Sequence, residues 1–210
     1  MRAPLPLAVV GAVLGATAVA WASTLTVTST SLTAGAPTAP AMFPVSVTLT
    51  NKAGQPVGKV NNGDTITVVW SQLLQASTLC TGATNTGGIS AAFKWSVSAG
   101  GGIGGDDVLA PSGTSTSCLS GLHVGSIDLG AAGYNTNTTT PIDFPSSTNT
   151  LTFGTSTTTL TVTLAGQTKG TAGTVTTGSA ALWTPDSATS DRAGRTCGSN
   201  LAKSSATVQF

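Results

Sequence analysis

Polar and apolar residues alternate in several short segments, and this pattern constrains the fold more than any other feature of the sequence. In Thr65-Ile-Thr-Val-Val-Trp70, the side chains of Ile66, Val68 and Trp70 fall on one side of an extended chain. Successive side chains of a strand point to opposite faces of a sheet, so this period of two predicts a strand with one buried face. Further apolar or alternating runs occupy residues 24–28, 45–49, 91–97, 122–129, 151–153, 160–164, 180–183 and 206–210.

The composition favours strands over helices. All seven acidic residues are Asp, and Thr and Ser together make up close to a third of the 210 residues. Amphipathic helices draw their exposed faces largely from Glu, Lys, Gln and Arg, whereas Thr is common in strands. Clusters of Gly, Asn, Ser and Pro separate the runs, so we expect an all-β sandwich of about nine or ten short strands. A β-solenoid is the alternative, but the Thr-x-Thr pairs recur at irregular spacing.

The first 22 residues are typical of a signal peptide. Arg2 precedes an apolar run at residues 7–22 that is broken only by Thr17 and ends in Ala20-Trp-Ala22. A membrane-spanning helix needs about 20 apolar residues, so this shorter run favours a cleaved leader over a retained anchor. We expect cleavage after Ala22, a Pro-, Ala- and Gly-rich N-terminal strand and linker at residues 23–44, and one β-domain at residues 45–210.

The charge balance excludes two classes of partner. Eight basic and seven acidic residues give a formal net charge of +1, which provides no electrostatic footprint for nucleic acid or for an anionic membrane. The sequence shows neither a wall-sorting motif nor a C-terminal apolar span. We therefore expect a secreted protein that is released or held loosely at the cell surface, with no membrane association once the leader is cleaved.

Three cysteines, Cys80, Cys118 and Cys197, allow at most one internal disulfide in an exported chain and leave one thiol over. Their spacing does not choose the pair. A catalytic cysteine is not expected, because the chain has a single His with no recognisable motif around it.

His123, Ser126 and Asp128 lie close together in sequence and are the candidates for a catalytic triad. The first glycine of a Gly-x-Ser-x-Gly elbow is missing around Ser126, where Val124 stands. Positions two apart on a strand face the same way without bringing a nucleophile onto its base. We therefore expect an ordinary strand histidine.

The glycine-rich segment at residues 100–105 formally contains Gly-x-Gly-x-x-Gly, but Asp106, Asp107 and an early proline follow it instead of a helix. A dinucleotide site needs that helix, so a loop and no cofactor are expected. Asp106 and Asp107 could offer oxygen ligands to Ca²⁺. Two acids alone do not make a metal site, and we expect them at a solvated loop tip.

Trp70, Trp95 and Trp183 could form a sugar-binding platform, but Trp70 and Trp95 stand in phase with aliphatic strand positions, which favours core packing. The many threonines on strand faces are also a feature of ice-binding surfaces. That function needs a flat, regular array, whereas Thr is also simply a good strand former at exposed positions.

Three further stretches carry recognisable patterns: Gly63-Asp-Thr-Ile-Thr-Val-Val-Trp70 with its continuation to Cys80, Ser117-Cys-Leu-Ser-Gly-Leu-His-Val-Gly-Ser-Ile-Asp-Leu-Gly130, and Trp183-Thr-Pro-Asp186 with its continuation to Gly194. Taken in order, they resemble the bacterial Ig-like surface domains found in S-layer and other secreted proteins. The chain departs from the family pattern at Gln72, where Glu is usual, and at Arg195, where Asn is usual. The resemblance implies an Ig-like sandwich, a disulfide between Cys80 and Cys118, and no enzymatic activity.

The expected function is therefore a secreted, non-enzymatic Ig-like domain with a structural or adhesive role toward an extracellular ligand. One alternative is an extracellular carbohydrate-binding module or a hydrolase. A retaining glycosidase needs two carboxylates, for which Asp186 and Asp191 are the candidates. Another alternative is a filament subunit that self-associates through edge strands or through Cys197.

Overall fold

A computed structural model of the protein describes residues 41–89, 92–113, 118, 121–206 and 208–210. These residues belong to one unit of the chain, Ala39–Phe210. The predicted signal peptide and the predicted strand at residues 24–28 lie outside the described residues.

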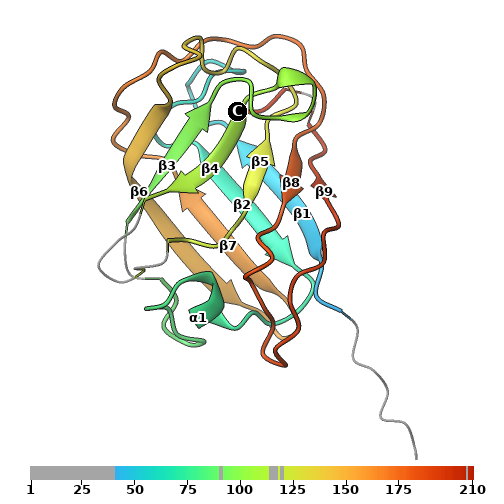
Figure 1. The fold of residues 1–210 in the computed structure, drawn as a ribbon. Helices are drawn as coiled ribbons and strands as arrows, with labels where there is room; N and C mark the ends of the chain where they lie inside the picture. The colour runs from blue at the N-terminus through green and yellow to red at the C-terminus, as the bar shows by residue number, and fades with distance from the viewer. Residues whose placement is uncertain (1–40, 90–91, 114–117, 119–120, 207) are drawn as a thin grey trace, which may run out of the picture. The chain divides into compact units, whose positions relative to one another are not determined.

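The described residues form an antiparallel all-β fold, as the alternating pattern predicts. The strands are β1 Pro44–Thr50, β2 Thr65–Trp70, β3 Phe93–Ser98, β4 Val108–Ser112, β5 Ser126–Asp128, β6 Ile142–Phe153, β7 Thr158–Thr163, β8 Leu182–Thr184 and β9 Ala202–Lys203. Two short helical turns accompany them, α1 Ala76–Leu79 and η1 Ile103–Gly105. Figure 1 shows how they are arranged.

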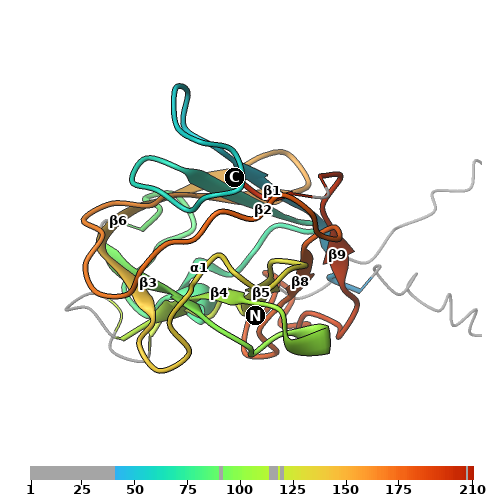
Figure 2. The same ribbon diagram turned by 90° about the horizontal axis from the view of Figure 1, so that it is seen from above.

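The strands follow the order β1-β2-β7-β6-β3-β4-β5-β8-β9, and the long strand β6 joins two layers. The second half of β6, residues 148–153, pairs with β7, whereas its first half pairs with β3. A register shift opposite Phe93–Trp95 lies between the halves, and Pro145 of β6 falls in it. Proline cannot donate to a sheet ladder and is tolerated at such bulges, which bend a strand. Seen from above, β1 and β2 lie in one layer and β3, β4 and β5 in the other (Figure 2).

The core lies between these layers and is built around three tryptophans. Trp70, Trp95 and Trp183 are all fully buried. The rings of Trp70 and Trp183 meet edge to face with centroids 5.0 Å apart, a favourable geometry for aromatic pairs. The indole N–H groups of Trp95 and Trp183 donate to Asn149 Oδ1 and to the Val124 carbonyl. The prediction that these tryptophans pack in the core is therefore confirmed, and none of them offers a surface platform to a sugar.

Several predicted strands need correction. Of the run at residues 122–129 only Ser126–Asp128 is a strand, and β4, β9 and residues 142–150 of β6 were not predicted. Residues 208–210 are not a strand. They pack as an irregular end in which the Tyr134 hydroxyl accepts from Gln209 N at 2.7 Å and the Phe210 carbonyl accepts from Gly58 N at 2.7 Å. The prediction of a strand at the C-terminus is therefore wrong, although its apolar residue is buried as expected. Side-chain packing and single hydrogen bonds hold this end in place, rather than pairing in a sheet.

A disulfide joins Cys80 to Cys118 over a sequence separation of 38 residues. It confirms the pairing that the resemblance implies. Cys80 directly follows α1, so the bond ties this turn to a distant part of the chain. Cys197 forms no disulfide and is buried. Burial raises the pKa of its thiol to about 11, so the reactive thiolate is scarce at neutral pH.

We expect the double variant Cys80→Ser/Cys118→Ser to lose up to about 4 kcal/mol of unfolding free energy, the chain-entropy value for a loop of this length. Chemical denaturation measures it. Cys197→Ser is the matched control, because it removes a thiol that closes no loop. An equal or larger loss in the control would contradict the role assigned to the disulfide.

Candidate functional site

His123, Ser126 and Asp128 do not form a triad. The His123 ring bonds to Asp186 instead, with Nδ1 2.9 Å from Oδ2. Asp128 accepts from the backbone N–H groups of Ile103 at 2.6 Å and Gly130 at 2.9 Å. Among the described residues no hydrogen bond links any two of the three candidates. Asp128 therefore holds the glycine-rich loop rather than orienting a base.

The His123–Asp186 pair links two turns that are distant in sequence. Asp186 also accepts from Ala188 N at 2.8 Å, and the Thr189 hydroxyl donates to the His123 carbonyl. Burial alone would raise the pKa of Asp186, but the Ala188 N–H and the His123 ring outweigh it and lower this pKa. Both side chains keep about a third of their exposure. No local pattern predicts this partner, because 63 residues separate the two groups.

Asp106 and Asp107 occupy different environments, and the expectation of a solvated loop tip is wrong for Asp107. Its side chain is 1% exposed and accepts from Gly133 N at 3.0 Å and Asn135 N at 2.7 Å. Burial and the nearby carboxylates of Asp128 and Asp107 raise the pKa of Asp106. No group of three His, Cys, Asp or Glu residues that could hold a metal ion is found in the described part of the chain.

The glycine-rich segment is a loop, as predicted. It contains only the three-residue turn η1. A side chain at Gly102 would come within 2.7 Å of the Asp128 carboxylate, so this position needs glycine for the close approach. Beside the loop is a pocket of about 270 Å³ that includes Ser126, Asp128 and Thr184 in its lining.

Asp191, one of the two carboxylates considered for glycoside hydrolysis, is 2% exposed. It accepts from the backbone N–H groups of Ala193 and Arg195 at 2.9 and 3.0 Å. Arg195 Nε and Nη2 approach its Oδ2 at 2.8 and 2.5 Å. Burial alone would raise the pKa of Asp191, but the hydrogen bonds of Arg195 and Ala193 lower it. Asp191 therefore organises a turn and has no free lone pair aimed at solvent.

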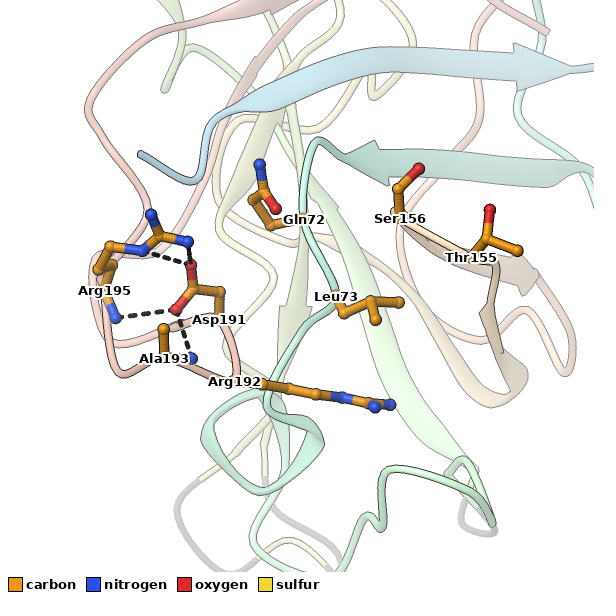
Figure 3. Close-up of a pocket in the computed structure, with 8 residues that line it drawn as sticks. All are labelled: Gln72, Leu73, Thr155, Ser156, Asp191, Arg192, Ala193 and Arg195. Atoms are coloured by element: carbon orange, nitrogen blue, oxygen red, sulfur yellow. Dashed lines mark hydrogen bonds and ion pairs between the residues drawn. The ribbon is translucent and has the colours of Figure 1, made fainter. Parts of the chain in front are cut away.

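A pocket of about 300 Å³ opens beside this turn (Figure 3). Its lining consists of Gln72, Leu73, Thr155, Ser156, Asp191, Arg192, Ala193 and Arg195. Both positions at which the chain departs from the resembled family, Gln72 and Arg195, meet here. The guanidinium of Arg192 lies 5.2 Å from the centre of the Phe153 ring and donates to the Asn85 carbonyl. The pocket offers amide, hydroxyl and guanidinium groups to a small polar ligand, but it holds no nucleophile paired with a base.

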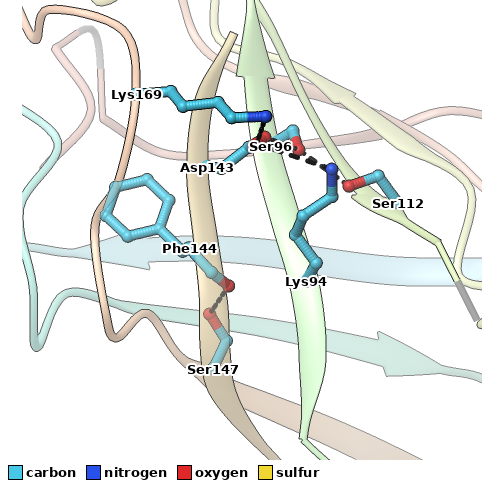
Figure 4. Close-up of polar contacts among 7 residues, drawn as sticks. All are labelled: Lys94, Ser96, Ser112, Asp143, Phe144, Ser147 and Lys169. Carbon is cyan, nitrogen blue, oxygen red and sulfur yellow. Dashed lines mark hydrogen bonds and ion pairs between the residues drawn. The ribbon is translucent and has the colours of Figure 1, made fainter. Parts of the chain in front are cut away.

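A second polar cluster lies across β3, β4 and β6 and was not predicted (Figure 4). The carboxylate of Asp143 is 5% exposed and is flanked by the ammonium groups of Lys94 at 3.5 Å and Lys169 at 3.8 Å. It also accepts from the Ser96 hydroxyl at 2.7 Å, which contacts the Ser112 hydroxyl at 2.7 Å. A buried carboxylate requires such partners. The cluster compensates the charge of Asp143 and has no imidazole that could activate a serine.

Comparisons with family models, curated proteins and solved structures find no match to the chain. Among the residues described, no helix has the length and hydropathy needed to cross a membrane.

Asp191→Asn tests the role assigned to the Arg195 pair. A carboxyl group whose pKa is lower in the folded state stabilises the fold above its ordinary value of 3.8, and this stabilisation is lost as pH falls through the folded pKa. We expect the variant to be less stable at pH 7 and to lose less of its remaining stability between pH 5 and about pH 2. Thermal denaturation across this range measures both effects, and an unchanged acid profile would contradict the assignment.

Proposed function

We propose that this protein is a secreted, non-enzymatic Ig-like β-sandwich with a structural or adhesive role at the cell exterior. The main support for this proposal is that the carboxylates of the protein serve to hold its structure together. Six of the seven aspartates accept hydrogen bonds that hold loops, turns or strands in place: Asp64, Asp107, Asp128, Asp143, Asp186 and Asp191. A general base must present a free lone pair to its substrate. The seventh, Asp106, has no histidine, serine, threonine or cysteine side chain bonded to its carboxylate among the described residues.

Two features support an address outside the cell. The leader-like residues 1–22 predict export. The Cys80–Cys118 disulfide is of the kind that persists in oxidising surroundings and is rare in the cytosol. The low content of charged residues and the net charge of +1 fit neither nucleic acid nor an anionic lipid surface as a ligand.

Cell fractionation tests the location. We expect the protein in the culture medium or in the wash of intact cells, with an N-terminus that begins at Ser23. A cytosolic marker protein controls for lysis. Recovery of the full chain from the cytosol, with Met1 or Arg2 at its N-terminus, would contradict export.

A hydrolase is the second candidate, and the partly exposed His123–Asp186 pair is the observation that favours it. Fluorogenic esters and glycosides test it on the purified protein. We expect wild type and His123→Ala to show the same background rate, because the ring bonds to Asp186 and to no nucleophile within the part of the chain that the structure describes. A wild-type rate that disappears in His123→Ala, while both proteins keep the same Tm, would overturn the non-enzymatic proposal.

A further inference from the structure

The outer face of the layer formed by β1, β2, β7 and β6 is an ordered array of threonines. One row across the four strands consists of Thr48, Thr67, Thr161 and Thr150, which are paired in register. The next row consists of Thr50, Thr65, Thr163 and Thr148. The third consists of Ser46, Val69, Thr159 and Thr152. We call these twelve positions the threonine array.

The array is exposed and its hydroxyl groups are available. Every position is exposed or half-buried, whereas the residues between them in the strands, such as Val68 and Leu160, face the core. The hydroxyls of Thr67 and Thr161 contact each other across strands at 3.4 Å. Within the described residues, none of the other threonine hydroxyls of the array hydrogen-bonds to the protein. Each can therefore bond to an external group.

The array has two fixed repeats. Neighbouring strands are about 4.8 Å apart, and alternate residues of one strand are about 6.8 Å apart. The β-branched threonine side chain has restricted χ1 freedom, so the side chains repeat with the backbone. A surface with two regular repeats matches a ligand that is itself periodic in two dimensions.

Charge complementarity further limits the ligand. The array carries no charged side chain, whereas the opposite layer carries the Lys94–Asp143 cluster. A face without charged side chains has no Coulombic attraction toward phosphate, carboxylate or cationic surfaces. It also has no aromatic ring on which a sugar could stack. Ordered water is a neutral lattice. Each of its molecules both donates and accepts hydrogen bonds, and its spacings are close to the two repeats.

We propose that the threonine array binds ice, with its hydroxyls replacing lattice waters and its methyl groups ordering the water between them. The sheet twist turns each strand relative to the next by about 20°, so the matched patch is small and centred on Thr67 and Thr161. Ice would be the ligand in the non-enzymatic binding role proposed above, and this inference rests on that proposed function. Its test uses purified protein and is independent of export, so the two can fail separately.

Inhibition of ice recrystallisation tests the proposal on the purified protein. We expect wild type to keep ice grains small under conditions in which serum albumin does not. Thr161→Lys places a long, strongly hydrated ammonium at the centre of the array and should abolish the effect. Thr150→Lys, at an exposed array position, provides a second variant if Thr161→Lys unfolds, and it should lose most of the effect.

Thr184→Lys is the matched control. Thr184 is also exposed on a strand, but on β8 in the other layer, so this variant should behave like wild type. Circular dichroism and Tm show that each variant is folded. Grains as large in wild type as in albumin, or equal activity in wild type and folded Thr161→Lys or Thr150→Lys, would overturn the proposal. Array-dependent sedimentation with chitin or cellulose, without any effect on ice, would also overturn it and assign the face to a polysaccharide.

Discussion

Side chains alternate between core and solvent along β1, β2, β7 and the second half of β6, and this alternation determines how the whole layer is built. It places Ile66, Val68 and Trp70 on the inner face of β2 and threonines on the outer face. Burying an aliphatic or aromatic side chain stabilises a fold by about 1.5–3 kcal/mol, so a slip of one residue would exchange a core for a polar layer. The register of this layer, and hence the threonine array, follows from that alternation.

The polar groups divide into two sets with different tasks. The scarce ionisable groups are used internally, as in Asp107, which closes a loop through Gly133 and Asn135, and Asp191, which holds its own turn through Arg195. Many of the abundant hydroxyls lie on the outer face of β1, β2, β7 and the second half of β6, of which β2 and β7 are paired on both sides. This division of tasks is the basis of the proposed binding or structural role.

Local patterns were sufficient to predict some elements and insufficient for others. Strand β2 was predicted with its observed bounds, Thr65–Trp70, because its alternation is unbroken. Strand β4 was missed because Asp107 and Pro111 interrupt the apolar pattern. Pro111 is tolerated because β5 pairs with β4 only at Val108 and Leu109, so no ladder partner lies opposite it on that side.

The candidate site could be predicted only in part, because its contacts join residues that are distant in sequence. The sequence offered Asp128 as the partner of His123, and the structure pairs His123 with Asp186. The cluster around Asp143 likewise depends on the pairing of β3 with β6. The disulfide was identified through a family resemblance, because three cysteines leave the choice of pair open. Only the fold decides which groups meet when dozens of residues separate them.

Thiol accessibility along β7 tests whether its side chains alternate between solvent and core. Residues 159–163 of β7 would be changed to Cys one at a time in a Cys197→Ser background, and the rate of alkylation of the native protein measured. We expect fast labelling at positions 159, 161 and 163 and slow labelling at 160 and 162, with the same alternation on β2. Uniform rates along the strand, or protection at 161 together with labelling at 160, would contradict it.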